Sequence, residues 1–256
     1  MLYLAFSRSC IMLVLMATAS TWALSAETLR IGAEDDWYPY TAYRHGEIQG
    51  MSVDIVKAAF AASGTAIELV PYPYARCMQL THEGQLAACF NTSPDRRIDS
   101  EFLLPEESLF SDDILLWANR EGAQPDEHLQ RLANRRVAVT IGYEYGPVFD
   151  NNRQVLRIPV RRDLSGFLML QRGRVDFVAA YRGTAQALFQ ENPQLAGQFV
   201  PVAVLHRPQL YLSLSRRHPH ARELLERFDS GMRTIRGNGH YRQILEHWHH
   251  DTEPAD

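Results

Sequence analysis

Polar side chains that could hold a small anion follow directly after an apolar segment in the first half of the chain. Residues Leu86–Phe90 are typical of a buried strand, and three amide or hydroxyl residues, 91–93, come next. Pro94 is favoured at the first position of a helix, so we expect a helix to begin there. Backbone N–H groups at that helix start and a guanidinium from Arg96 or Arg97 would converge on a carboxylate or a similar anion. An ordinary capped helix with two solvated arginines would show the same short pattern.

The segments around this polar motif predict alternating strands and helices. Strands are expected at 29–33, 67–70 and 86–90, with helices at 53–62 and 75–82 between them. Short links between such elements are typical of a mostly parallel α/β sheet. Ligands bind beyond the carboxyl ends of the strands in these sheets, which is where the polar motif falls.

The alternation continues through the rest of the chain. We expect strands at 113–118, 137–141, 155–158, 175–180 and 209–214, and helices at 127–132, from about 148, at 164–171 and at 184–191. Two further helices, at 219–236 and 240–248, close the chain. The sequence therefore predicts an α/β fold class with two similar halves and a C-terminal pair of helices.

The first 26 residues are interpreted as a cleavable signal peptide. Arg8 precedes an apolar run at 10–19, and small residues follow near position 26. We therefore expect an exported, periplasmic protein. Two cysteines remain after cleavage, Cys77 and Cys89, and whether they pair is left open because the sequence does not supply their separation.

Charge and composition exclude some classes of partner and site. The signal segment removes one of the 26 Lys+Arg and none of the 30 Asp+Glu, so the mature chain is mildly acidic, which argues against nucleic-acid binding. A group of histidines, 240–250, fits an exposed final helix better than a metal site, because no ligand set of the usual spacing accompanies it. We predict neither a metal nor a cofactor.

Several ordered motifs together resemble those of periplasmic solute-binding proteins of the polar-amino-acid type, family 3. They are Arg30–Tyr40, Gly50–Ile55, Gly84–Leu86, Ser93–Arg96, Val137–Gly142, Gly173–Asp176 and Gly239–Leu245 with Trp248. The resemblance implies a two-lobe, type II binding-protein fold with two hinge strands. It places lobe I at 27–107 plus 204–256 and lobe II at 108–203.

The resemblance also implies a mechanism and a set of ligand-binding residues. Two lobes would close over a small solute, with Arg96 pairing with a ligand carboxylate and an aromatic side chain of the first loop stacking on the ligand. Backbone N–H groups after the strand at 137–141 would bind the same carboxylate. With the polar motif at 91–93 and two tyrosines that the local sequence suggests, the expected binding residues are Trp37, Tyr38, Tyr74, Asn91, Thr92, Ser93, Arg96, Gly142, Tyr143, Glu144 and Tyr181.

Two departures from the family pattern bear on the ligand. Tyr181 stands where amino-acid binders usually place the aspartate that holds the ligand ammonium, and Glu144 stands where a small hydroxyl residue is common. A buried carboxylate beside a ligand carboxylate would be repulsive. Either Glu144 serves a cation or the ligand is not a standard α-amino acid, and the surrounding tyrosines would suit a flat or cationic molecule.

These features predict a non-enzymatic binding protein that delivers a small polar solute to an ABC-type permease, with which it associates transiently as a monomer. An enzyme on the same lobes is an alternative, because an elimination would need one well-placed acid, such as Glu144 or Asp36. A sensory module that reports to a membrane receptor is a further alternative, and the sequence does not separate it from transport.

Overall fold

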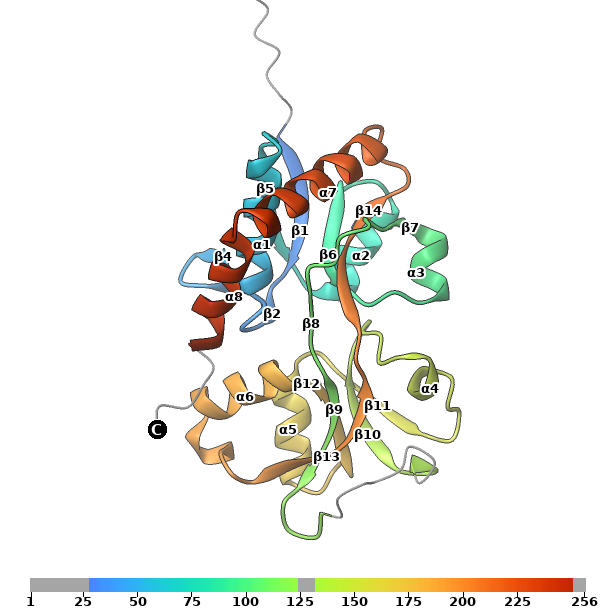
Figure 1. Cartoon of the computed structure of the whole chain (residues 1–256). Helices are drawn as coiled ribbons and strands as arrows, with labels where there is room; N and C mark the ends of the chain where they lie inside the picture. The colour runs from blue at the N-terminus through green and yellow to red at the C-terminus, as the bar shows by residue number, and fades with distance from the viewer. Residues whose placement is uncertain (1–27, 124–131, 251–256) are drawn as a thin grey trace, which may run out of the picture.

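The computed structural model describes residues 28–123 and 132–250, with side chains up to residue 248. Two α/β lobes lie one above the other, and extended segments of the chain run between them (Figure 1). The α/β class and the two-lobe arrangement predicted from the sequence are confirmed. The predicted signal peptide lies outside the described residues, as does most of the helix expected at 127–132.

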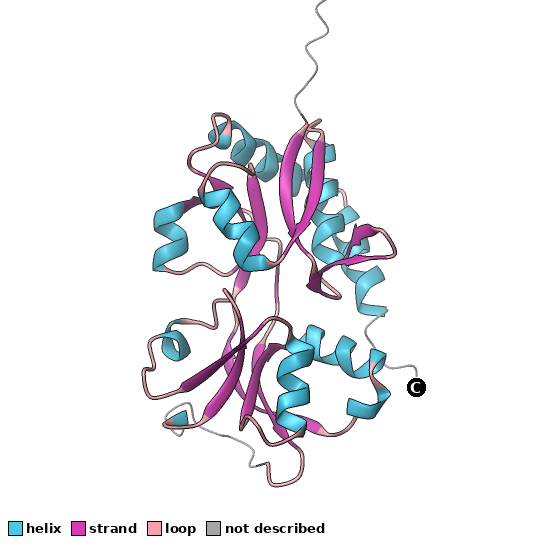
Figure 2. Cartoon of the chain, turned by 180° about the vertical axis from the view of Figure 1, so that it is seen from behind, coloured by secondary structure: helices cyan, strands magenta, loops and turns pink. Residues whose placement is uncertain are grey.

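Lobe I is built on a sheet whose parallel half comes from the start of the chain. Its strands run in the order β5 (Ile67–Tyr72), β1 (Leu29–Glu34), β6 (Ala88–Thr92), β14 (Gln209–Ser215) and β7 (Phe102–Leu103), and β8 (Phe110–Ser111) pairs with β14. Strand β1 is parallel to β5 and β6, whereas β14 is antiparallel to β6. All five residues of β6 are buried, because helices cover both faces of this central strand (Figure 2).

Helices from both ends of the chain cover this sheet. They are α1 (Met51–Ala62), α2 (Tyr74–His82), α3 (Arg96–Glu101), α7 (Ala221–Gly237) and α8 (His240–His250), with a small antiparallel sheet of β2 (Asp36–Trp37), β3 (Thr41–Arg44) and β4 (Glu47–Gln49) beside them. Helix α1 packs closely on α7 at Gly231, where a Cβ atom would collide with the carbonyl oxygen of Ala59. Lobe I therefore needs both ends of the chain to bury its core.

The start of α3 differs from the expectation. The helix was expected at Pro94, but it begins at Arg96, because the carboxylate of Asp95 accepts a hydrogen bond of 2.7 Å from the N–H of Ile98 and caps the first turn. This shift of the helix start decides where the two arginines that follow Asp95 point.

Lobe II repeats the same architecture. Its strands run in the order β11 (Leu156–Val160), β10 (Arg136–Thr140), β12 (Phe177–Tyr181), β9 (Ile114–Asn119) and β13 (Phe199–His206), with helices α4 (Pro147–Asp150), α5 (Asp163–Gln171), α6 (Arg182–Glu191) and the 3-10 turn η2 (Pro193–Leu195). Strand β12 is completely buried. An aromatic cluster of Trp117, Phe167, Phe189 and Phe199 fills the space between the sheet and its helices.

The chain passes between the lobes in two places. It leaves the lobe I sheet after Ser111, the end of β8, and joins the lobe II sheet at Ile114, and it returns between His206 and Gln209. Val204, where a boundary was expected, lies inside β13 of the lobe II sheet. Sheet membership therefore favours a second boundary a few residues later, and the exact division of the chain into lobes stays a proposal.

Two further findings concern the cysteines and the helices. Cys77 of α2 and Cys89 of β6 form a disulfide, with their Cα atoms 6.0 Å apart, which answers the question that the sequence left open. Across residues 28–123 and 132–250, no helix is long and apolar enough to cross a membrane.

Candidate functional site

The carboxyl ends of strands from both lobes meet at one small cavity. Its lining residues are Glu34, Trp37, Tyr74, Asn91, Tyr143, Glu144 and Tyr181. Glu34, Asn91 and Tyr181 lie at or next to the ends of β1, β6 and β12, and Tyr143 and Glu144 follow β10. The cavity has a volume of about 10 Å³, which is room for about one water molecule.

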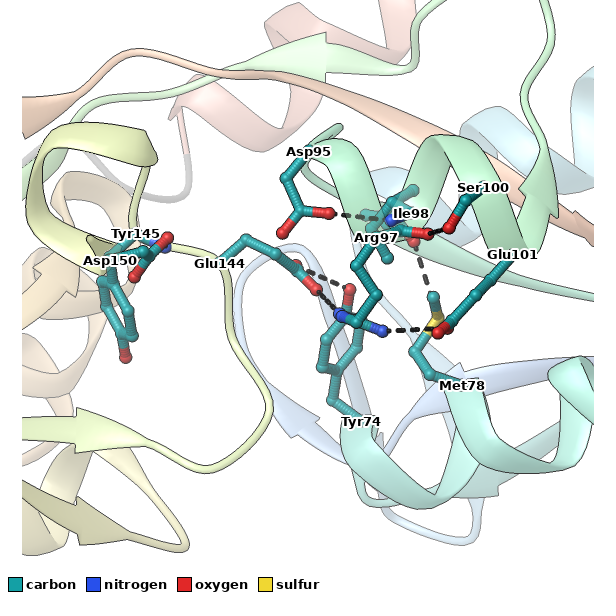
Figure 3. Close-up of polar contacts among 11 residues, drawn as sticks. Tyr74, Met78, Asp95, Arg97, Ile98, Ser100, Glu101, Glu144, Tyr145 and Asp150 are labelled. Carbon is teal, nitrogen blue, oxygen red and sulfur yellow. Dashed lines mark hydrogen bonds and ion pairs between the residues drawn. The ribbon is translucent and has the colours of Figure 1, made fainter.

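Glu144 of lobe II is held by two groups of lobe I. The Tyr74 hydroxyl donates a hydrogen bond of 2.9 Å to its carboxylate, and the Arg97 guanidinium donates one of 2.7 Å (Figure 3). Burial raises the pKa of Glu144 from 4.5 to about 8, although the Tyr74 hydrogen bond and the charge of Arg97 both act to lower that pKa. Burial therefore favours the protonated form of Glu144 in this closed arrangement, against the opposing effect of the Arg97 charge.

Glu34 of lobe I has a neutral partner from lobe II. The Tyr143 hydroxyl donates a hydrogen bond to Oε1 of Glu34. Burial raises the pKa of Glu34 well above its usual value; the Tyr143 hydrogen bond lowers it, and the negative charges of Asp163 and two other aspartates, Asp35 and Asp36, raise it further. The largest charge effects on Glu34 thus come from acidic groups, whereas Glu144 also has the cation Arg97 beside it.

Aromatic rings form the walls of the cavity. Trp37 is 2% exposed, and its ring meets that of Tyr181 edge-on at 4.9 Å and that of Tyr143 edge-on at 6.1 Å. The ring of Tyr40 lies 4.5 Å from Trp37 on another side. These contacts join aromatic residues of both lobes into one cluster, so closure of the lobes buries apolar area as well as polar groups.

Two side chains in the cavity wall have polar atoms without a hydrogen-bond partner. They are Nε1 of Trp37 and both the oxygen and the nitrogen of the Asn91 amide. Asn91 is 6% exposed and has a left-handed backbone conformation, with φ of 71°. Buried polar atoms are almost always hydrogen-bonded, so these three atoms mark a place where a ligand or a water molecule would be bound.

Further ion pairs and hydrogen bonds join the lobes around this cavity. Asp36 pairs with Arg162 at 2.6 Å, Arg44 pairs with Glu191, and the Tyr40 hydroxyl donates to Asp112 at 2.6 Å. Two larger hollows flank the closed contact, one of about 520 Å³ beside Arg97 and Gly142 and one of about 250 Å³ beside Tyr38 and Arg162. The structure is therefore that of the closed lobes.

The structure brings six of the eleven sequence-predicted site residues into the cavity wall: Trp37, Tyr74, Asn91, Tyr143, Glu144 and Tyr181.

The other five predicted residues do not line the cavity. Tyr38 lies outside it, with the Arg44 guanidinium 3.9 Å above its ring. Thr92 and Ser93 are buried, and the Thr92 hydroxyl contacts the sulfur of Met78 at 3.6 Å. Gly142 faces Ala75 across the lobes. Arg96 is exposed on α3. Ligand contact by these residues stays a prediction.

Two residues of the site have no place in the predicted set. Arg97, which the polar motif offered as an alternative to Arg96, is the arginine that reaches Glu144. Glu34 received no role, although its position was a usable signal, because it is the last residue of the first parallel strand and such strand ends face the ligand. Within the described ranges, no group of three or more His, Cys, Asp or Glu could hold a metal ion.

Solved structures share the fold at low sequence identity. A mutant of ArgBP from T. maritima superposes with a TM-score of 0.74 and 20% identity, covering 86% of this chain and 94% of that chain. A histidine kinase sensor domain with similarity to periplasmic binding proteins gives 0.76 and 19%, covering 87% and 96%. The ancestral amino-acid-binding protein AncCDT-1, a precursor of cyclohexadienyl dehydratase, gives 0.72 and 17%, covering 86% and 95%.

Sequence comparisons place the chain in a family. No curated protein matches it. The model of the bacterial extracellular solute-binding proteins, family 3, matches residues 29–251, which is nearly the whole of the described chain. This match agrees with the two lobes and with the cavity between the ends of their strands. The chain therefore belongs to family 3 of the bacterial extracellular solute-binding proteins.

Proposed function

We propose that this protein captures a small polar solute between its lobes in the periplasm and delivers it, as a monomer, to the permease of an ABC-type importer. One observation carries the proposal: each lobe contributes a buried glutamate to the cavity, and the hydrogen-bond donors to each glutamate come from the other lobe. A solute that contacts both glutamates would bind the closed state better than the open state and would shift the equilibrium toward closure.

Side chains nearly fill the cavity, so a solute enters only when the lobes separate. Separation breaks the hydrogen bonds from Tyr143 to Glu34 and from Tyr74 to Glu144, and it exposes both carboxylates to water. Closure over a solute would replace these hydroxyl donors with donors of the solute. The same two glutamates would thus accept hydrogen bonds from tyrosine hydroxyls when the lobes close without a solute, and from the solute when they close around it.

The proposal is tested by a thermal-shift screen of the chain from residue 27 onward against amino acids, amines, small carboxylates and sugars. A ligand that binds the folded state raises the melting temperature when it is present well above its dissociation constant. We expect one compound to raise the melting temperature and to be recovered unchanged. If no compound raises the melting temperature, or if the one that does is chemically altered, capture of a solute for transport is refuted.

A second candidate function is an elimination reaction on the same lobes, and the protonated state of Glu144 favours it. A buried carboxylic acid whose pKa is about 8 could give its proton to a hydroxyl group that leaves as water. A C–H bond of the neighbouring carbon would break at the same time. Its electron pair would form the new double bond, and Glu34 in its ionised form would accept the proton released from that carbon. Loss of a bound hydroxy acid over time, abolished in Glu144→Gln, would establish this function in place of transport.

A further inference from the structure

The charge around Glu34 points to the kind of ligand that the cavity would hold. Glu34 is 5% exposed, and Asp163, which is 7% exposed, is among the acidic groups that act on it. The nearby arginines serve other residues, because Arg162 pairs with Asp36 at 2.6 Å and Arg161 pairs with Asp35 at 3.8 Å. An ionised buried carboxylate without a cationic partner is costly. A cationic ligand would supply the missing charge.

Two tyrosine hydroxyls donate hydrogen bonds to the two glutamates at positions that the N–H donors of a cationic ligand could take. The Tyr143 hydroxyl reaches Glu34, and the Tyr74 hydroxyl reaches Glu144, each with a single O–H donor. A protonated amine carries up to three N–H donors and a full positive charge, so one amine could replace both hydroxyls. Charge-assisted hydrogen bonds to carboxylates are roughly twice as strong as neutral ones.

The walls of the cavity also suit a cation. Trp37, Tyr143 and Tyr181 present their rings around it, and the faces of such rings attract cationic groups within about 6 Å. Trp37 and Asn91 add an independent observation, because their buried polar atoms line the cavity without a partner. The indole N–H is a donor and the amide offers a donor and an acceptor, so together they fit an uncharged oxygen, such as a hydroxyl.

A carboxylate has no comparable place here. Among the residues that the structure describes around the cavity, none is an arginine, a lysine or a histidine. Arg97 reaches Glu144 from outside this lining and already pairs with two carboxylates, those of Glu144 and Glu101. A ligand carboxylate would therefore lie near Glu34 and Glu144 and be repelled by them when they are ionised.

We propose that the cavity binds an organic amine that lacks a carboxylate, with Glu34 and Glu144 holding its cationic group and Asn91 with Trp37 holding an uncharged oxygen. This inference rests on the proposed solute-binding function and narrows its ligand class. It makes Glu34 the residue that selects for the positive charge, because the nearby arginines pair with Asp35 and Asp36 instead.

Calorimetry with three matched pairs of compounds tests the proposal: ethanolamine and serine, tyramine and tyrosine, and agmatine and arginine. Each amine differs from its amino acid only by the carboxylate. We expect at least one amine to bind to the chain from residue 27 onward at least tenfold more tightly than its amino acid. Tighter binding of the amino acids, or binding by none of the three amines, would overturn the proposal. In either case, closure on another solute in the wider screen would leave the solute-binding function standing.

Two variants connect the result to Glu34. Glu34→Gln keeps an acceptor for the Tyr143 hydroxyl and removes the charge, so we expect at least a tenfold loss of affinity for the amine and a cooperative melting transition as in the parent. Glu68→Gln, whose side chain is 58% exposed on β5, is the control and should bind the amine unchanged. Equal amine affinity in Glu34→Gln and Glu68→Gln would overturn the assignment of the cation to Glu34.

Discussion

The hydroxyl of Tyr143 in lobe II donates a hydrogen bond to the carboxylate of Glu34 in lobe I, which lies 109 positions earlier in the chain. The hydroxyl of Tyr74 in lobe I donates in the opposite direction, to Glu144 in lobe II, at 2.9 Å. Each lobe thus contributes one tyrosine hydroxyl that donates a hydrogen bond to a buried glutamate of the other lobe. These two hydrogen bonds join the lobes at the cavity between their strand ends, so removing either one should alter closure.

The Tyr143 hydroxyl should be needed for closure of the unliganded protein. Tyr143→Phe leaves Glu34 buried without a donor, which costs roughly 1–3 kcal/mol and is relieved when the lobes open. We expect a larger radius of gyration in X-ray scattering without ligand. Tyr43→Phe is the control, because Tyr43 is 51% exposed. An unchanged radius in Tyr143→Phe would show that this hydrogen bond does not hold the lobes together.

Gly183 offers a probe of closure that leaves each lobe intact. It lies in α6 of lobe II, and a methyl group there would collide with the Tyr40 hydroxyl of lobe I; the three atoms nearest to the added methyl all belong to Tyr40. Gly183→Ala should therefore disfavour closure by about 1–3 kcal/mol and weaken ligand binding.

The same substitution should not destabilise lobe II, because alanine is about 1 kcal/mol better than glycine within a helix. Urea unfolding and X-ray scattering would separate the two effects. Gly237→Ala is the matched control, since no atom beyond the neighbouring backbone of its own helix lies within 4 Å of its added methyl. A loss of unfolding free energy with unchanged closure in Gly183→Ala would contradict the expectation.

Arg97 and its neighbour Arg96 should differ in their effects. Arg97→Gln removes the cation that pairs with Glu144, and we expect a loss of about 1–2 kcal/mol in the closed state, between the limits for exposed and buried pairs. The pKa of Glu144 should rise further, because the charge of Arg97 lowers it. Arg96→Gln should change unfolding and closure by less than about 0.5 kcal/mol. Equal effects of the two substitutions, measured by urea unfolding and scattering, would be evidence against this pairing.

The free energy of unfolding should fall as the pH rises from about 7 to 9. Burial raises the pKa of Glu144 from 4.5 in the unfolded chain to about 8 in the folded protein. The tighter proton binding of the folded state stabilises it fully below the unfolded pKa, and this stabilisation is lost as the pH rises through about 8. His206, whose pKa burial lowers, acts in the opposite direction but is neutral in both states above pH 7. Asp113 and Asp176 have lowered pKa values and titrate at much lower pH.

Urea unfolding across this pH range would measure the slope. Glu144→Gln should reduce it without abolishing it, because Glu34 also has a raised pKa. Glu68→Gln, at an exposed carboxyl, should keep the parent slope. Parallel pH profiles for Glu144→Gln and the parent protein would show that Glu144 is ionised in the folded state throughout.

Local patterning was sufficient for most of the elements. The alternation of apolar segments predicted β6 and β12 within a residue or two of their observed bounds, since a buried strand is a short apolar run between turns. The same reasoning put residues 91–93 and 142–144 at strand ends, where Asn91, Tyr143 and Glu144 now line the cavity. The pairing of Cys77 with Cys89 could not be obtained in this way, because it depends on the distance between α2 and β6.

The hydrophobic pattern was enough to predict two α/β halves and the loops at their strand ends, because buried strands and helices have different periods. Which polar residues of those loops meet depends on how the two lobes pack. Helix α3 is capped by Asp95 and begins at Arg96, two residues later than expected, and successive helical residues point about 100° apart, so Arg97 rather than Arg96 reaches Glu144. Glu34 became a site residue only because Tyr143, from the other lobe, lies against it, and a contact between two lobes leaves no periodic mark in either segment.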